Sequence, residues 1–96
     1  MKLIFNKSNP NWTDDYKINE LFIATNTRYF VDLARLRIPE VGYISIVELY
    51  KLLGMDAPKS ALVLGWDDTN IDDIFLHTEC IDDHIEIETN AKNLVS

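Results

Sequence analysis

The sequence predicts an α+β fold in which two or three helices pack on a small antiparallel sheet with a C-terminal β-hairpin. Three observations support this class. Apolar residues recur every three or four positions over residues 16–37, which is the period of a helix. Capping residues bound a second, shorter helix near residues 45–54. Residues 85–89 alternate between apolar and polar side chains, as a half-buried strand does.

Length and composition indicate one folded domain over residues 1–96. The 96 residues are 47% hydrophobic, which is typical of a globular chain with a modest core. The single cysteine, Cys80, excludes an intrachain disulfide. No apolar run approaches the roughly 18 residues of a membrane span or resembles the hydrophobic region of a signal peptide. We therefore expect a cytoplasmic protein that does not contact the membrane.

The first half of the chain predicts a strand followed by a helix. Lys2–Phe5 has the composition of a short strand, and a polar turn follows it. Thr13 or Asp14 is placed to cap a helix that Pro39 and Gly42 close. A hairpin within residues 22–31 is the alternative, because polar residues interrupt good strand formers there. The helical stripe that we expect to face the core consists of Ile18, Leu21, Phe22, Thr25, Tyr29, Leu33 and Leu36.

The second helix has the clearest boundary signals in the chain. Ser45 and Glu48 have the spacing of a capping box at its start. Gly54 provides the left-handed residue that ends it, and Met55 is placed to fold back onto the last turn. We expect a helix over residues 46–53.

A helical turn and two strands are predicted for the remainder. Pro58 can open a short helical turn, and residues 67–70 form a turn cluster. Residues 74–78 and 85–89 are predicted strands that meet at a turn of two aspartates. We expect little to hold the tail, residues 90–96.

The net charge of −7 is concentrated in the second half of the chain. Residues 1–48 carry six basic and six acidic side chains, whereas residues 49–96 carry three and ten. An acidic chain repels phosphate backbones, so direct nucleic-acid binding is not expected. The acidic half is either a binding face or a solvated surface that aids solubility.

None of the candidate clusters predicts a catalytic, metal or cofactor site. The paired aspartates lack the spacing and the central glycine of a calcium loop. His77, Cys80 and His84 are one ligand short of a structural zinc site. Cys80 lies in the most acidic stretch, where its thiolate is disfavoured, and we expect it to behave as a small hydrophobic residue.

One resemblance accompanies these patterns. Residues 42–55 (GYISIVELYKLLGM), the step Leu64-Gly65-Trp66 and the acidic segment Ile85-Glu86-Ile87-Glu88 resemble small uncharacterised accessory proteins of Gram-positive bacterial phages and integrative mobile elements. The resemblance covers roughly residues 42–88. It implies an accessory role in a mobile element and transfers no catalytic residue.

These observations favour a non-enzymatic protein–protein interaction module. We expect the partner to be another protein with a basic surface, and a homo-oligomer is also considered. The alternative is an acidic inhibitor that occupies the nucleic-acid-binding groove of a host defence nuclease, as a nucleic-acid mimic does. The residues expected to bind the partner are Asp67, Asp68, Asp72, Asp73, Asp82, Asp83, Glu86, Glu88, Tyr29 and Phe30.

Overall fold

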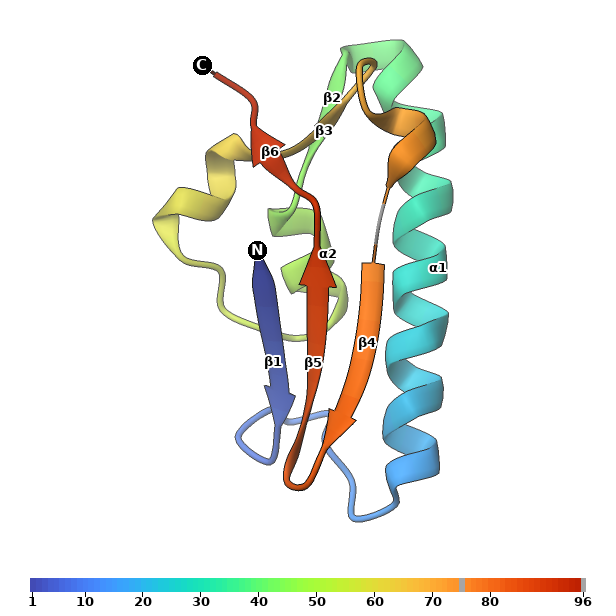
Figure 1. The fold of residues 1–96 in the computed structure, drawn as a ribbon, viewed down its shortest axis with the longest axis vertical. Helices are drawn as coiled ribbons and strands as arrows, with labels where there is room; N and C mark the ends of the chain where they lie inside the picture. Colours follow the sequence, from blue (N-terminus) through green and yellow to red (C-terminus); the bar gives the residue numbers. More distant parts are fainter. Residues whose placement is uncertain (75, 96) are drawn as a thin grey trace.

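The computed structural model describes residues 1–74 and 76–95, and it confirms the α+β class. One long helix stands beside two antiparallel sheets with the strand orders β1-β5-β4 and β2-β3-β6 (Figure 1). The elements are β1 (Lys2–Asn6), α1 (Tyr16–Val41), β2 (Tyr43–Ser45), α2 (Val47–Leu52), β3 (Leu64–Asp67), β4 (Leu76–Ile81), β5 (His84–Thr89) and β6 (Lys92–Asn93). Two 3₁₀ turns are also present: Lys59–Val63 lies between α2 and β3, and Ile71–Asp73 lies between β3 and β4.

The first sheet turns one face to the core and the other to solvent. Leu3 and Phe5 of β1 and Ile85 and Ile87 of β5 are buried. Their neighbours along both strands lie on the opposite face, as the two-residue period of a strand requires. The alternation predicted for the last long strand is therefore correct. β4 begins at Leu76, later than the predicted 74–78 strand, and residue 75 of that prediction is outside the described residues.

Helix α1 is longer than predicted and is continuous through residues 22–31, so the hairpin alternative is wrong. Its N-cap is Asp15, whose carboxylate accepts a hydrogen bond from the Lys17 amide at 2.9 Å. At the other end, Gly42 adopts a φ of 94° and its amide donates to the Ile38 carbonyl at 2.8 Å. Pro39 lies inside the last turn and does not end the helix.

The buried face of α1 differs from the predicted stripe. The buried residues are Asn19, Ile23, Phe30, Ala34 and Ile38. Five members of the predicted stripe, Ile18, Leu21, Thr25, Tyr29 and Leu36, are exposed. The helix carries apolar residues on two faces, and packing selected the face that meets the sheets.

Aromatic contacts join α1 to both sheets. The rings of Phe30 and Trp66 have centroids 5.3 Å apart, and both side chains are fully buried. Phe22 stacks on Phe5 of β1 with centroids 5.5 Å apart. Through these contacts, α1 packs on β1 of the first sheet and on β3 of the second.

Helix α2 ends as predicted but begins differently. The Met55 amide donates to the Tyr50 carbonyl at 2.9 Å and the Gly54 amide to the Lys51 carbonyl at 3.2 Å, which is the Schellman arrangement. The predicted capping box is absent. Ser45 Oγ accepts from the Val47 amide and donates to the Ala61 carbonyl, with donor–acceptor distances of 3.2 and 2.8 Å. The Glu48 carboxylate instead pairs with Arg37 of α1, with Oε1 3.4 Å from Nη1.

The tail is better anchored than expected. Lys92–Asn93 form β6 and pair with β3. Asn90 Oδ1 accepts from the Trp66 indole at 2.8 Å, and the Leu94 amide donates to the Val63 carbonyl at 2.7 Å. Polar side chains of the tail therefore satisfy buried groups, which a search for apolar patterns overlooks.

Candidate binding surfaces

The eight acidic residues proposed as a binding face form two separate groups. Asp67, Asp68, Asp72 and Asp73 surround the 3₁₀ turn that precedes β4, whereas the other four lie on β5 and its turn. The β4–β5 turn, which holds Asp82 and Asp83, lies at the opposite end of β4 from the 3₁₀ turn (Figure 1). Glu88 instead pairs with His77 near the start of β4. The fold therefore does not bring the eight carboxylates together into one acidic face.

Asp67 in the first group serves the fold. Its carboxylate accepts from the Thr69 amide at 2.9 Å and lies 2.9 Å from the Lys92 ammonium. The hydrogen bond from the Thr69 hydroxyl, followed by that from Lys92, lowers the pKa of Asp67 to about 2. This carboxylate stabilises the β3–β6 corner and is already paired.

The second group lies on the solvent face of the first sheet. Strand register places His84, Glu86 and Glu88 of β5 between the β1 residues Asn6, Ile4 and Lys2 and the β4 residues Ile81, Glu79 and His77. Lys2 Nζ lies 3.1 Å from Glu86 Oε1 and 4.0 Å from Glu88 Oε2. Part of the negative charge on this face is therefore compensated within the chain.

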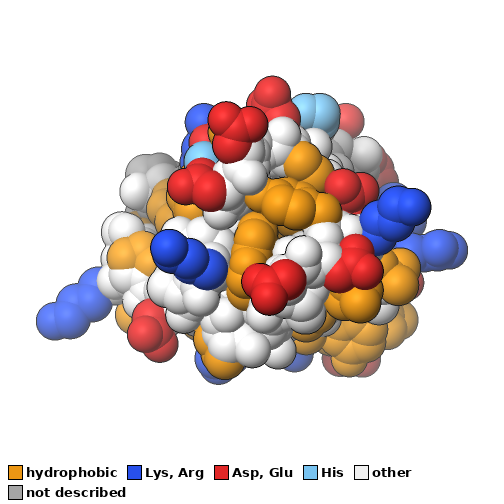
Figure 2. Space-filling model, turned by 90° about the horizontal axis from the view of Figure 1, so that it is seen from below, with side chains coloured by type: hydrophobic (Ala, Val, Ile, Leu, Met, Phe, Trp, Pro, Cys, Tyr) orange, Lys and Arg blue, Asp and Glu red, His pale blue; other side chains and the backbone are white. Residues whose placement is uncertain are grey.

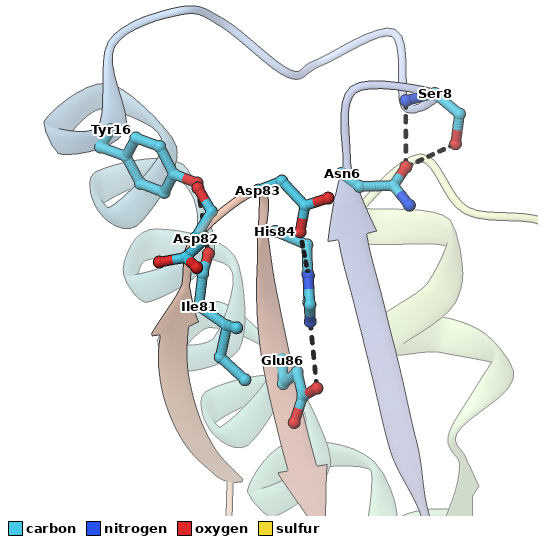
Figure 3. Close-up of polar contacts among 8 residues, drawn as sticks. All are labelled: Asn6, Ser8, Tyr16, Ile81, Asp82, Asp83, His84 and Glu86. Atoms are coloured by element: carbon cyan, nitrogen blue, oxygen red, sulfur yellow. Dashed lines mark hydrogen bonds and ion pairs between the residues drawn. The ribbon is translucent and has the colours of Figure 1, made fainter.

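His84 is held between two carboxylates (Figure 3). Its Nδ1 lies 2.8 Å from Asp83 Oδ1 and its Nε2 lies 3.0 Å from Glu86 Oε2. The hydrogen bond with Asp83, followed by that with Glu86, raises the pKa of His84. Both ring nitrogens face acceptors, so the imidazolium form is favoured.

This arrangement does not serve a serine nucleophile. Ser8 is near the same end of the sheet, but its hydroxyl donates to Asn6 Oδ1 and not to a histidine nitrogen (Figure 3). A general base needs a free nitrogen within reach of the proton that it removes. The His84 cluster therefore has the geometry of a charge cluster on a sheet face.

The turn between β4 and β5 is tied to the start of α1. The Tyr16 hydroxyl donates to the backbone carbonyl of Asp82 at this turn (Figure 3). Seen from below, this end of the molecule shows acidic side chains interspersed with basic and apolar ones (Figure 2). Charge at this end is mixed and does not form a continuous acidic patch.

Cys80 and the two histidines do not form a metal site. Cys80 is exposed on β4, contrary to the expectation of a small hydrophobic residue, and its Sγ lies 3.4 Å from Glu20 Oε1. Desolvation, followed by the Glu20 hydrogen bond, raises the pKa of this thiol. Within residues 1–74 and 76–95, no group of three histidine, cysteine or carboxylate side chains is placed to hold a metal ion.

The two aromatic residues proposed on α1 have opposite environments. Phe30 is fully buried, so its assignment to a binding surface is wrong. Tyr29 is 55% exposed and belongs to a row that we call the α1 stripe: Ile18, Leu21, Tyr29 and Leu36. Their spacing of three, eight and seven residues keeps them along one side of the helix.

A second apolar surface lies where the chain leaves α1. Val41, Tyr43, Leu62 and Val95 are each more than half exposed and line a hollow of about 530 Å³. Sequence periodicity did not indicate this surface, because its members come from three segments that are distant in the chain.

In the described part of the chain, no helix is both long enough and apolar enough to span a membrane.

Comparisons with known proteins return no relative. No protein-family model, curated protein or solved structure matches this chain.

Proposed function

We propose that this chain is a non-enzymatic protein–protein interaction module that binds its partner through the α1 stripe. The role of a phage or mobile-element accessory protein is part of this proposal and rests on the sequence resemblance alone. The observation that carries the binding role is the exposure of Ile18, Leu21, Tyr29 and Leu36, between 52% and 72% for each side chain.

A row of large apolar side chains on a long helix favours a helical or grooved partner. Side chains at this spacing are the anchors by which one helix packs against another or into a groove. Tyrosine is enriched at such contacts because it combines a large apolar ring with a polar tip. The partner that fits is a protein surface with an apolar groove, and a second copy of the chain is one such surface.

Substitutions that place charge on the stripe test this function. Leu21→Glu with Leu36→Glu should abolish self-association in light scattering after size-exclusion chromatography, or capture of the partner in a pull-down. Leu62→Glu is the matched control, because Leu62 is 64% exposed and lies outside α1. Binding that survives the double substitution but is lost with Leu62→Glu would assign the interface to the hollow beside β2.

The acidic inhibitor remains a second candidate because of the solvent face of the first sheet. Register pairs Glu79 with Glu86 on neighbouring strands, and Glu88 follows two residues along β5. The negative charge that Lys2 and His84 leave uncompensated on this face would attract a basic groove. Its contribution to the association rate falls as salt rises. Glu79→Gln with Glu88→Gln should weaken such a partner and remove the salt dependence, whereas a salt-independent interaction contradicts this candidate.

A further inference from the structure

β1 is an edge strand, and part of its backbone lacks a partner. Met1 and Thr89 exchange two backbone hydrogen bonds, of 3.0 and 2.8 Å. Hydrogen-bonded pairs alternate along an antiparallel ladder, so Leu3 and Phe5 point their amides and carbonyls at β5. Lys2 and Ile4 point theirs away. Among the described residues, neither Lys2 nor Ile4 makes a further backbone hydrogen bond.

The turn at the other end of β5 predicts the same alternation of hydrogen-bonded and non-hydrogen-bonded pairs. Ile81 and His84 close a two-residue connection, and such a closing pair is hydrogen-bonded. His84 and Glu86 therefore point their backbone groups at β4, which leaves Ile85 and Ile87 to bond β1. Two ends of the sheet thus agree on which β1 groups are free.

A walled hollow of about 330 Å³ lies along this edge. One wall is the loop at residues 8–10 and the other is the segment after α2, residues 54–56. Asn9 Nδ2 holds the walls together by donating to the Leu53 carbonyl at 2.8 Å. The hollow is within the range of roughly 300–1,000 Å³ that is typical of ligand sites.

Backbone geometry and charge identify the occupant. Amides and carbonyls repeated at every second residue are matched by another extended polypeptide. Asp56 lines the hollow, and no other described residue forms an ion pair with it. Each copy of the chain carries a net charge of −7, so at this edge charge favours a basic segment over a second copy.

We propose that the edge of β1 binds an extended, basic segment of a partner protein, which adds a fourth strand to the first sheet. Lys2 and Ile4 supply the backbone hydrogen bonds, and Asp56 pairs with a lysine or arginine of the segment. The inference rests on the proposed function in assuming a protein partner, but it uses a surface other than the α1 stripe.

A titration with the peptide acetyl-KVTVK-amide, followed by amide chemical shifts, tests this site. Saturable shifts should appear at Lys2, Ile4 and Met55. Ile4→Pro removes the free amide while leaving the β1–β5 bonds, because proline is tolerated where an edge N–H faces solvent. It should weaken the peptide about tenfold. Asp56→Asn should weaken it less and reduce its salt dependence.

Peptide variants keep the test decisive if Ile4→Pro does not fold. Two N-methylated peptides can be made, one methylated on the amides that would face β1 and the other on the amides that would face away. Only the first should lose binding. If both peptides lose binding equally, or if the unmodified peptide shows no saturable binding, the proposal is overturned. Shifts at the same amides that depend on protein concentration alone would instead assign the edge to a second copy.

The α1 stripe provides the control that separates the two proposals. Leu21→Glu with Leu36→Glu should leave the affinity for acetyl-KVTVK-amide unchanged. If these substitutions abolish peptide binding, the peptide site lies on α1 and the edge assignment is wrong. If they abolish only the binding of the protein partner, both surfaces are independent.

Discussion

The Lys2 ammonium on β1 lies 3.1 Å from the Glu86 carboxylate on β5. This ion pair bridges two neighbouring strands that are far apart in the sequence. Two like charges side by side on one strand face would by themselves lead us to expect that Glu86→Gln with Glu88→Gln holds or slightly raises the melting temperature. Lys2 and His84 already supply the counter-charge, so that expectation changes.

We therefore predict that Glu86→Gln lowers the melting temperature slightly, because it removes the partner of both Lys2 and His84. Glu88→Gln should leave the melting temperature nearly unchanged, since Glu88 is 4.0 Å from Lys2 and exposed. Thermal denaturation of both single variants at low and high salt measures this. A larger effect of Glu88→Gln would contradict the assignment of Lys2 to Glu86.

His84 should make stability depend on pH near neutrality. Its pKa is raised in the folded state by the Asp83 and Glu86 carboxylates, so its stabilising contribution is complete below the ordinary value of 6.5. The contribution is lost as pH rises through the raised pKa. Asn6, Lys7 and Ile81 are its other neighbours across the strands and in the adjoining hollow.

Urea denaturation over a pH series starting at roughly pH 6 measures the effect. The free energy of unfolding should fall as pH rises, and His84→Gln should flatten this slope. His77→Gln is the matched control, because His77 is the other histidine of the chain. A slope that disappears with His77→Gln and persists with His84→Gln would contradict the assignment.

Two glycines separate backbone strain from side-chain crowding. Gly42 and Gly54 adopt φ values of 94° and 71°, which L-residues reach at a cost of about 1–2 kcal/mol. A Cβ on Gly42 would meet no atom within 4 Å, whereas one on Gly54 would collide with Asn11 Nδ2. Gly42→Ala should reduce the free energy of unfolding by the backbone strain alone. Gly54→Ala should reduce it further, because of the added collision with Asn11. Equal losses in chemical denaturation would show that Asn11 moves aside freely.

Adjacent aromatic residues on α1 should behave in opposite ways. Phe30→Ala should reduce the free energy of unfolding by about 3–5 kcal/mol, because it opens a cavity against Trp66. Tyr29→Ala should change it by less than about 0.5 kcal/mol, since the ring is 55% exposed. Tyr29→Ala should weaken the partner all the same. A stable fold with unchanged binding would exclude Tyr29 from the interface.

Divalent metal ions should leave the melting temperature unchanged. An ion that binds only the native state stabilises it in proportion to the logarithm of its concentration above the dissociation constant. The aspartate pairs are spread along the chain, and Asp67 is already paired with Lys92. Millimolar calcium and micromolar zinc, each against a chelator control, measure this prediction. A rise of several degrees would reveal a site that side-chain geometry did not indicate.

Local signals in the sequence determined several features without reference to the rest of the fold. Gly54 and Met55 end α2 in the predicted Schellman arrangement because its hydrogen bonds close within six residues. Ile85 and Ile87 are buried because strict alternation leaves a strand one way to face the core. Helix ends and strand faces of this kind depend on neighbours in the chain.

Tertiary packing decided the features on which the proposed function rests. Helix α1 has apolar residues on two faces, and packing against both sheets, including the Phe22–Phe5 and Phe30–Trp66 contacts, selected the buried one. That choice left Ile18, Leu21, Tyr29 and Leu36 exposed, and these form the surface that we propose binds a partner. The pairing of Lys2 with Glu86 likewise joins two distant parts of the chain. The free edge of β1 results from its pairing with β5, which lies near the other end of the sequence. A sequence specifies its local hydrogen bonds by spacing, whereas burial and charge pairing depend on which distant segments the chain brings together.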